Sequence, residues 1–493
     1  MAQTRIPLLT SFLILTLTTP FSSSSSHDHQ LKFQLLDVSG SLQQARRVFS
    51  GTSSSLRASA VAESHRPALN SSSSILSLSL HPRSSLPQNN NNNNNDNYDY
   101  HNNNYTHLTL ARLARDKARV QSVHSRATFG YLRPAQFGSP LVSGLRQGSG
   151  EYFARIGMGR PARDLYLIAD TGSDVSWIQC RPCVDCYDQS DPIYDPSAST
   201  TYKDLPCNSG ECNALRRSAC RVNTCRYQVA YGDGSYTVGS LATETISFVP
   251  SGASVSGVAI GCGHNNVGLF SGAAGLLGLG GGPLSLPSQL HSASFSYCLV
   301  NRDSASASTL DFGSEPPPPP DSIFAPLIRN PFVDTFWYVG LAGISIGGRR
   351  LPIPPSLFKL GRDRRGGVIV DSGTAVTRFP REVYRVLRDA FVGMATGLPR
   401  TATGFSLFDT CYDLSGLRRV SVPAVSFEFT GGRGTWRLPA ANYMVPVDGL
   451  GKFCLAFAGM EGTMSIIGNM QQQGTRVVYD VANRRIAFSP NKC

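Results

Sequence analysis

Long apolar runs, dense charge and helical periodicity are all scarce in this sequence of 493 residues, and each shortage excludes a class of protein. Only 16% of the residues are charged, and the Lys and Arg residues are scattered rather than gathered in a block that would bind phosphate backbones. Beyond residue 25, no apolar stretch is long enough to span a bilayer. We therefore expect neither a nucleic-acid partner nor a membrane partner.

The formal net charge of +12 does not change this expectation, because of where the charge lies. Residues 1–145 carry 13 Lys and Arg against 6 Asp and Glu, whereas residues 146–493 carry 32 against 27. More than half of the excess positive charge therefore lies in the first 145 residues. A mildly basic, solvated surface accounts for the remainder.

Cysteine is absent from the first 179 residues, and all 12 cysteines fall between Cys180 and Cys493. An even number in one part of the chain predicts a disulfide framework and an oxidising compartment. The cluster Cys180-x2-Cys183-x2-Cys186 could instead bind zinc, but no pair of histidines with ligand spacing accompanies it. We expect no metal and no cofactor.

The first 25 residues have the pattern of a signal peptide. Arg5 precedes an apolar run, Ile6 to Phe21, and a run of serines follows. This pattern predicts entry into the secretory pathway, leading to the apoplast or the vacuole. The competing interpretation is a chloroplast transit peptide, because the chain is rich in serine and poor in acids as far as Ser55.

Residues 26–145 have the composition of a low-complexity pro-segment. Serine and asparagine runs occupy 71–74 and 89–95, and too little apolar periodicity is present to offset the entropy of ordering. Two glycosylation sequons begin at Asn70 and Asn104. Residues 107–127 form the exception, a basic amphipathic helix candidate. It is either a solvated linker helix or an intramolecular partner whose cations lie against acidic groups in a cleft.

From residue 148 onward the sequence predicts a mostly β protein. Glycine (47 residues) and proline (31 residues) separate short runs rich in β-branched and aromatic side chains. A single strong helical pattern covers 380–396. The expected strands cover residues 152–156, 165–169, 227–230, 245–249, 255–260, 295–300, 337–341, 368–370, 425–429, 475–479 and 485–488.

Two halves of this region repeat one pattern. An apolar strand runs into Asp170-Thr171-Gly172-Ser173 in the first half and into Asp371-Ser372-Gly373-Thr374 in the second. Each half later contains a second element, Leu276-Leu277-Gly278 and Ile466-Ile467-Gly468. A lone Asp-Thr-Gly arises by chance in roughly one chain in ten of this length. Two copies in matching contexts are far less frequent, so the repeat is a strong signal.

Each residue type in the repeat has a physical reason. Glycine allows a tight turn, and the hydroxyl groups can hydrogen-bond within and across the two turns. The later apolar-glycine element can pack behind each turn. Two turns related by approximate symmetry bring Asp170 and Asp371 face to face, where like charges favour a shared proton. Such a pair can activate water and polarise a carbonyl group without a covalent intermediate.

On these motifs, residues 148–493 resemble the pepsin-type aspartic proteases, specifically the plant group that includes the nepenthesins. The resemblance implies a bilobed, pepsin-like double β-barrel with a cleft between the lobes, an N-terminal lobe at 146–330 and a C-terminal lobe at 331–493. It also implies a monomeric endopeptidase that acts on polypeptides at acidic pH and is made as a proenzyme. The saposin-like insert of other plant relatives is absent from the sequence.

The resemblance also assigns roles to individual residues. Asp170 and Asp371 would be catalytic, and Gly172, Ser173, Gly373 and Thr374 would line the substrate site. Tyr231, in Tyr-Gly-Asp-Gly-Ser-Tyr, would be the tyrosine of a flap that closes over substrate, supported by Trp177. The stretch 180–225 matches the cysteine-rich insertion of the group. The implied disulfides are Cys180–Cys183, Cys186–Cys262, Cys207–Cys225, Cys212–Cys220, Cys298–Cys493 and Cys411–Cys454.

Two alternatives stay open. Some relatives keep the fold but act as binding proteins that inhibit glycoside hydrolases, although this chain retains both aspartates, both glycines and Tyr231. Others are described as chloroplast nucleoid proteins with proteolytic activity, and the small charge excess of residues 146–493 gives DNA binding little support.

Overall fold

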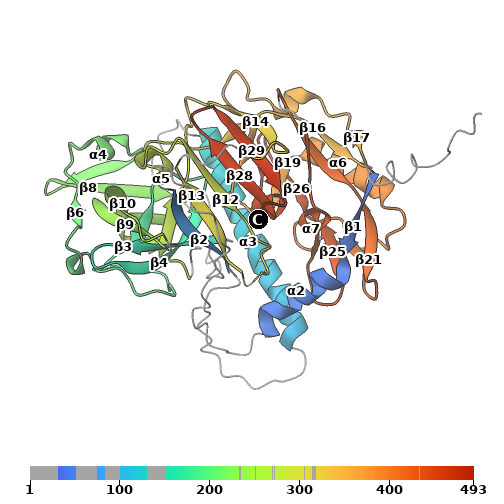
Figure 1. Ribbon diagram of the computed structural model, residues 1–493, viewed down its shortest axis with the longest axis horizontal. Helices are drawn as coiled ribbons and strands as arrows, with labels where there is room; N and C mark the ends of the chain where they lie inside the picture. The colour runs from blue at the N-terminus through green and yellow to red at the C-terminus, as the bar shows by residue number, and fades with distance from the viewer. Residues whose placement is uncertain are drawn as a thin grey trace, which may run out of the picture.

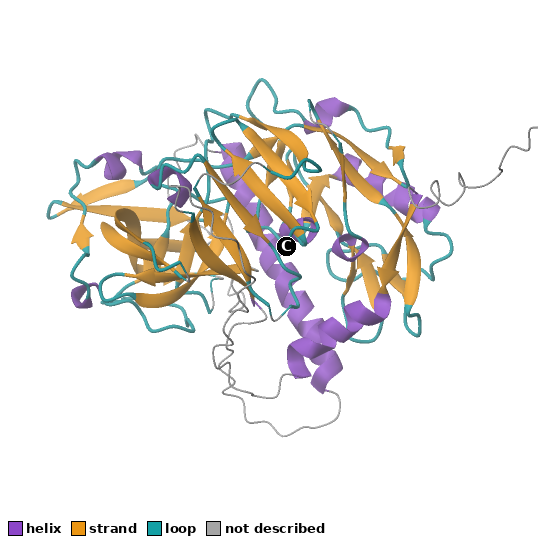
Figure 2. Ribbon diagram, in the orientation of Figure 1, coloured by secondary structure: helices purple, strands orange, loops and turns teal. Residues whose placement is uncertain are grey.

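The computed structural model describes residues 32–50, 75–83, 100–129 and 152–493, apart from short gaps at 232–234, 250, 269, 271, 305, 314–317 and 432–433. The expected signal peptide, the sequon at Asn70 and the asparagine run lie outside the described residues, as does the side chain of Asn104. Two β-rich lobes flank the longest described helix, and the other helices are much shorter (Figures 1 and 2). The expected mostly β, bilobed fold is confirmed.

The N-terminal lobe is built from antiparallel strands joined by tight turns, and its longest hairpin pairs β9 with β10. Its short helices are η2 (Pro196–Ala198), α4 (Gly210–Ala214) and α5 (Leu286–Gln289). Its strands are β3 (Tyr152–Met158), β4 (Arg163–Asp170), β5 (Trp177–Gln179), β6 (Lys203–Asp204), β7 (Ser218–Arg221), β8 (Thr224–Ala230), β9 (Tyr236–Phe248), β10 (Ser254–Val267) and β11 (Gly275–Gly278).

The C-terminal lobe holds the one long helix of the two lobes, α6 (Arg381–Met394), among the described residues. Val383, Leu387 and Phe391 lie on one face of α6 and are fully buried, as their spacing of four predicts. The other helices are η3 (Pro355–Phe358), α7 (Ala440–Tyr443) and α8 (Asn469–Gln472). The strands are β15 (Tyr338–Val339), β16 (Leu341–Ile346), β17 (Arg349–Arg350), β18 (Val368–Val370), β19 (Thr377–Pro380), β20 (Cys411–Asp413), β21 (Arg419–Pro423), β22 (Val425–Phe429), β23 (Thr435–Arg437), β24 (Met444–Pro446), β25 (Lys452–Leu455), β26 (Phe457–Met460) and β27 (Ser465–Ile467).

An antiparallel sheet joins the lobes. Its strands pair in the order β2, β13, β12, β28, β29 and β14, and β2 also pairs with β3 of the N-terminal lobe. The rings of Phe295 and Tyr479 stack across it with centroids 4.4 Å apart. The bounds are β2 (Leu76–Pro82), β12 (Ser294–Cys298), β13 (Ser308–Phe312), β14 (Ile323–Ile328), β28 (Thr475–Asp480) and β29 (Arg485–Pro490).

Parts of residues 26–145 fold onto both lobes, which differs from the low-complexity interpretation of this region. Strand β1 (Phe33–Asp37) pairs with β21, helix α2 (Val38–Ser50) follows it, and β2 lies inside the interlobe sheet. Helix α3 (Tyr100–Phe129) extends the helix expected at 107–127 and lies between the lobes (Figure 1). Strand β2 has an alternation of leucine and serine, with Leu78 and Leu80 buried, which the low-complexity interpretation overlooked. Strand β1 shows no such alternation and pairs with a strand that is distant in sequence.

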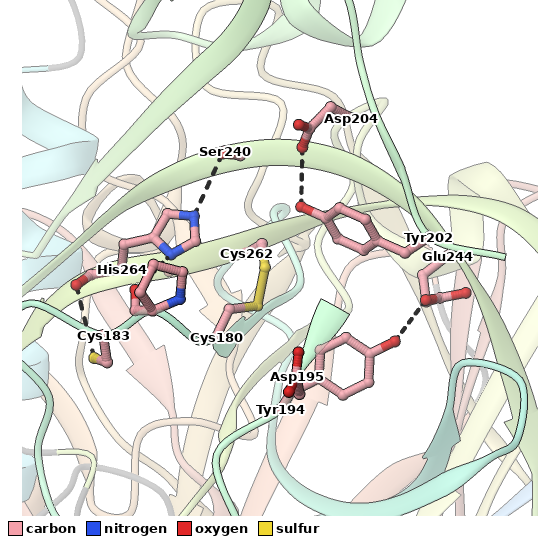
Figure 3. Close-up of a disulfide and its surroundings, with 12 residues drawn as sticks. Cys180, Cys183, Tyr194, Asp195, Tyr202, Asp204, Ser240, Glu244, Cys262 and His264 are labelled. Carbon is pink, nitrogen blue, oxygen red and sulfur yellow. Dashed lines mark hydrogen bonds between the residues drawn. A yellow bond between two sulfur atoms is a disulfide. The ribbon is translucent and has the colours of Figure 1, made fainter. Parts of the chain in front are cut away.

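All twelve cysteines form disulfides, and two of the six expected pairings are confirmed, Cys298–Cys493 and Cys411–Cys454. The expected Cys180–Cys183 and Cys186–Cys262 pairs are wrong. Because β5 runs parallel to β10, Cys180 lies beside Cys262 with Cα atoms 5.4 Å apart. Cys183 bonds instead to Cys186 within one turn. Figure 3 shows the Cys180–Cys262 bond near Tyr194, whose hydroxyl donates to Glu244 (2.6 Å).

The expected Cys207–Cys225 and Cys212–Cys220 pairs are also wrong. Cys220 and Cys225 lie directly opposite each other in the β7–β8 hairpin, and each bonds to a cysteine that precedes the hairpin, one in a turn and one in α4. Cys207 bonds to Cys220, and Cys212 bonds to Cys225, with Cα separations of 5.6 and 6.0 Å. The observed and expected pairings differ only in that Cys220 and Cys225 exchange partners. Sequence spacing cannot distinguish these two pairings.

Within the described part of the chain, no helix has both the length and the apolar character needed to cross a bilayer.

A pair of leucines tests where the core of the C-terminal lobe lies. Leu455 is fully buried on β25, whereas Leu450 is 60% exposed. We expect Leu455→Ala to lower the free energy of unfolding by about 2–5 kcal/mol, because the substitution leaves a cavity. Leu450→Ala should change it by less than about 0.5 kcal/mol. Chemical denaturation followed by fluorescence measures both, and equal effects would contradict this packing.

Candidate active site

The two repeated turns place Asp170 and Asp371 at the ends of buried strands, β4 and β18. The later apolar-glycine element runs parallel to each strand: β11 pairs with β4, and β27 pairs with β18. The expected packing of these elements behind the turns is thereby confirmed. Glycine is required where the turns meet, because a Cβ atom on Gly373 would lie 2.5 Å from Asp170 Oδ1. The two carboxyl groups therefore face each other across the junction of the lobes.

Each carboxylate accepts the same two hydrogen bonds from its own turn. At Asp170, the Gly172 N–H donates to Oδ1 (2.9 Å) and the Ser173 hydroxyl donates to Oδ2 (2.6 Å). At Asp371, Gly373 and Thr374 donate in the same way, at 3.1 and 2.6 Å. These bonds fix both side chains and leave one edge of each carboxyl group facing the other lobe.

Thr171 and Ser372 bind the two turns to each other. The Thr171 N–H donates to Ser372 Oγ (3.1 Å), and the Ser372 N–H donates to Thr171 Oγ1 (2.9 Å). Each hydroxyl also donates to the strand of the opposite lobe, at Val370 O (3.4 Å) and Ala169 O (3.0 Å). The reciprocal bonds set the distance between the two carboxylates and do not depend on anything bound in the cleft.

A cation from α3 lies between the two carboxylates. Arg119 Nη2 lies 2.5 Å from Asp170 Oδ1 and 3.2 Å from Asp371 Oδ2, and all three side chains are buried. The guanidinium group is therefore paired with both aspartates, and more closely with Asp170. Arg119 is one of the cations of the helix expected at 107–127, but its sequence position did not distinguish it from its basic neighbours.

The surroundings of the two carboxyl groups move their pKa values apart. Burial raises the pKa of Asp170, but the charges of Arg119 and Arg126, with the bonds from its own turn, outweigh burial and hold that pKa below its ordinary value. Burial also raises the pKa of Asp371, and the neighbouring Asp170 charge adds to burial, so the pKa stays above its ordinary value despite Arg119. Carboxyl pairs with separated pKa values are suited to acid–base chemistry.

Tyr231 covers the N-terminal side of the site. Its hydroxyl accepts a hydrogen bond from Trp177 Nε1 (3.0 Å), and its ring packs against Phe270. Burial raises the pKa of Tyr231 to about 12, so the phenol stays protonated. The guanidinium of Arg126 lies 5.7 Å from the centroid of the Tyr231 ring. The turn that follows Tyr231, residues 232–234, lies outside the described residues.

Further contacts attach α3 to the cleft, and sequence reasoning missed them. Asp116, the one acidic residue of α3, accepts hydrogen bonds from the backbone of the C-terminal lobe and pairs with Arg378. At the other end, Arg112 Nη1 lies 2.7 Å from Asp303 Oδ1. A lone acid within a basic helix is the signal that could have identified Asp116. No sequence pattern indicates the role of Arg378, because nothing near it in the sequence predicts a carboxylate partner.

Apolar side chains of α3 fill two pockets in the C-terminal lobe. Leu113 packs among Phe408, Val447 and Met470. Val120 and Val123 pack in a second cluster that includes Phe336, Tyr338 and Ile466. Because Leu113, Asp116, Val120 and Val123 recur at intervals of three and four, they lie on one helix face. That face covers the aspartate pair completely.

No group of three or more His, Cys, Asp or Glu side chains is arranged to hold a metal ion within the part of the chain that the structure describes.

Comparisons with known proteins match both lobes. Residues 152–314 match the family described as Xylanase inhibitor N-terminal, and residues 336–490 match Xylanase inhibitor C-terminal. Aspartyl protease family protein 2 of Arabidopsis thaliana is 53% identical over 397 residues, covering 78% of this chain and 81% of that protein. Aspartic proteinase nepenthesin-1 of Nepenthes gracilis is 41% identical over 364 residues, covering 72% and 81%.

Solved structures share the fold at lower identity. Basic 7S globulin from soybean aligns with a TM-score of 0.56 at 22% identity, over 70% of this chain and 94% of that chain. A structure described as edgp aligns with a TM-score of 0.58 at 20% identity, over 70% and 93%. The resemblance drawn from the two aspartate motifs is confirmed by these relatives.

Ser372 tests the junction between the turns. We expect Ser372→Ala to lower the free energy of unfolding by about 1–3 kcal/mol, because the buried Thr171 N–H loses its acceptor. Ser372→Thr, which retains the hydroxyl group, should recover part of the loss. Ser306→Ala, on the exposed surface, is the matched control. A Ser372→Ala protein as stable as this control, in chemical denaturation, would contradict the assigned role.

Proposed function

The chain belongs to the pepsin-type aspartic proteases of plants, and on that premise we propose that it is an endopeptidase that hydrolyses polypeptides at acidic pH and is made as a secreted proenzyme. The observation that carries the proposal is the symmetric support of Asp170 and Asp371 by their own turns, together with the cross-lobe bonds of Thr171 and Ser372. A protein that had abandoned hydrolysis would gain nothing from two buried carboxylates held face to face.

The proposed reaction uses a water molecule between the two carboxyl groups. With Arg119 absent, two carboxylates this close share one proton, since full ionisation would place like charges together. The ionised member accepts a proton from the water as it attacks the peptide carbonyl, and the protonated member donates to the carbonyl oxygen. The tetrahedral intermediate then breaks down: the carboxyl that took the proton from water gives it to the amide nitrogen, which leaves as an amine, and the new acid group returns its hydroxyl proton to the other carboxylate. Tyr231 closes the site above the substrate.

In the proposed proenzyme, Arg119 occupies the place of that water and of the substrate carbonyl. Its guanidinium neutralises both carboxylates and α3 fills the cleft, so no peptide reaches the pair. The pro-segment is thus proposed as the intramolecular partner of the enzyme. Activation requires α3 to leave the cleft.

The pKa directions give the sign of the pH dependence. Because the pKa of Asp170 is lowered while Arg119 is bound, the ion pair stabilises the closed form fully above the ordinary carboxyl pKa of about 3.9. The stabilisation is lost as pH falls through the lowered value. The raised pKa of Asp371 acts in the opposite direction, because a carboxyl that binds its proton more tightly in the closed form stabilises that form on acidification. Acid therefore favours release of α3 through Asp170.

Export from the cytosol is part of the proposal. Six disulfides and the signal-peptide pattern favour the apoplast or vacuole over the chloroplast. We propose that the enzyme acts as a monomer, with glycans on Asn70 and Asn104. The alternative is a binding protein, in keeping with the Xylanase inhibitor description of the matched families. The binding-protein alternative predicts a secreted protein that hydrolyses no peptide at any pH.

Replacing either aspartate tests the proposal against this alternative. We expect Asp170→Asn and Asp371→Asn each to reduce peptide hydrolysis by at least about a thousandfold, since each removes one partner of the acid–base pair. Cleavage of an unfolded polypeptide by the processed protein at acidic pH, and its inhibition by pepstatin, provide the measurement. Asp321→Asn, at an exposed position, is the matched control.

Thermal denaturation of the same variants separates chemistry from folding. In processed form, without α3 and its Arg119, the variants should unfold within a few degrees of the processed parent protein, because asparagine preserves the shape of the side chain. Undiminished cleavage by either variant would contradict the catalytic assignment. Absence of cleavage by the parent protein itself would favour the binding-protein alternative.

A further inference from the structure

Asp116 of α3 occupies a built carboxylate site in the wall of the cleft. Its Oδ1 atom accepts hydrogen bonds from the N–H groups of Ala375 (2.7 Å) and Val376 (3.0 Å). Arg378 Nη2 donates to the other oxygen, Oδ2. The Asp116 side chain is fully buried and the Arg378 side chain is only 5% exposed. Two backbone donors and a guanidinium group thus converge on one carboxylate, and such charge-assisted hydrogen bonds are stronger than neutral ones.

This carboxylate site is continuous with the catalytic turn. Ala375 and Val376 follow Thr374 directly, and the Thr374 hydroxyl donates to Asp371. Arg378 lies on β19, which pairs with β26 and β27 of the C-terminal lobe. Ala375 and Val376 lie directly before β19, so all three donors belong to the C-terminal lobe and none belongs to α3.

The carboxylate site lies about as far from the aspartate pair as the side chain of a neighbouring residue would in a bound substrate. Asp116 precedes Arg119 by three positions, so the two side chains are about 4.5 Å apart along the helix axis. An extended peptide advances about 3.3 Å per residue. A substrate bound across Asp170 and Asp371 would therefore place a side chain in the carboxylate site one to three residues from the bond cleaved.

Departure of α3 leaves these donors without their acceptor. Buried N–H groups and a buried guanidinium group are costly without a partner. In the described part of the chain Arg378 has no second salt-bridge partner. Apolar substrate side chains would leave the three donors without an acceptor. The carboxylate of an acidic side chain would accept the same hydrogen bonds that Asp116 accepts.

We propose that in the processed enzyme Ala375, Val376 and Arg378 form a substrate subsite that takes the side chain of Asp or Glu. Arg378 is then a specificity residue, and Asp116 is its intramolecular substitute in the proenzyme. This inference rests on the proposed proteolytic function, since it names the peptides that the same cleft prefers.

The test compares peptides that differ by one charge. A full-length chain with a site-specific protease sequence placed within 130–151 is processed, acidified to release α3, and assayed at about pH 5, where Glu is largely ionised. The peptides carry Glu or Gln in turn at each position on either side of the cleaved bond. We expect kcat/KM to favour Glu over Gln by about tenfold to a hundredfold at one position.

Variants of Arg378 show whether this residue sets the preference. Arg378→Gln should reduce the Glu-to-Gln ratio to about one, and Arg378→Lys should retain part of it. Arg378→Glu should instead favour a peptide with Lys at the same position, a reversal that a merely structural role would not produce. The matched control is Arg381→Gln, because Arg381 is exposed and pairs with Glu461 on the surface.

The outcomes separate the two proposals. Cleavage of neither Glu nor Gln peptide would contradict the proteolytic function itself. Cleavage of both with equal kcat/KM at every position would overturn the subsite while leaving the function intact. An Arg378→Gln enzyme with the ratio of the parent protein would also overturn it.

Discussion

Two carboxylates buried face to face need either a shared proton or a cation. The other contacts at the junction of the lobes depend on this requirement. The lobes each contribute one aspartate, and Thr171 and Ser372 fix their separation through reciprocal bonds across the junction. In the closed form Arg119 supplies the cation, which explains why a helix from outside the lobes lies in the cleft. Removing one partner from a buried ion pair costs about 3–5 kcal/mol, so Arg119 and the aspartates depend on one another.

The contacts that surround Arg119 explain how a helix with five basic side chains is held in one position. Asp116 fixes its register against the C-terminal lobe, and Leu113 and Val123 fill apolar pockets on either side of the pair. Strands β1 and β2 anchor the same N-terminal region to sheets of both lobes, away from the cleft. Closure is therefore spread over apolar, backbone and ionic contacts. Among these contacts, the pair of Arg119 with Asp170 has the lowered carboxyl pKa that makes it sensitive to acid, and it lies where the substrate would bind.

The sequence was sufficient for the fold and for the pair of facing aspartates, because both are encoded by local patterns that occur twice. Asp170 and Asp371 each follow an apolar strand and precede glycine, and the elements behind them could be matched by composition. The pairing partners of Cys220 and Cys225, the strand β1, and the partnership of Asp116 with Arg378 could not be predicted, because each depends on which segments meet in the fold. Strand β2 could have been predicted, because Leu76, Leu78 and Leu80 alternate with serine.

In the proposed proenzyme Arg119 is the acid-sensitive contact that keeps the cleft closed, and the pH of activation measures this directly. The pH of a solution of the full-length chain is lowered in steps, and loss of the segment ahead of residue 152 is followed by gel electrophoresis together with peptide hydrolysis. Arg119→Gln should be processed and active at a higher pH than the parent protein, whereas Lys117→Gln, at an exposed position of the same helix, should match the parent. An Arg119→Gln chain that stays latent down to the same pH as the parent would contradict the account.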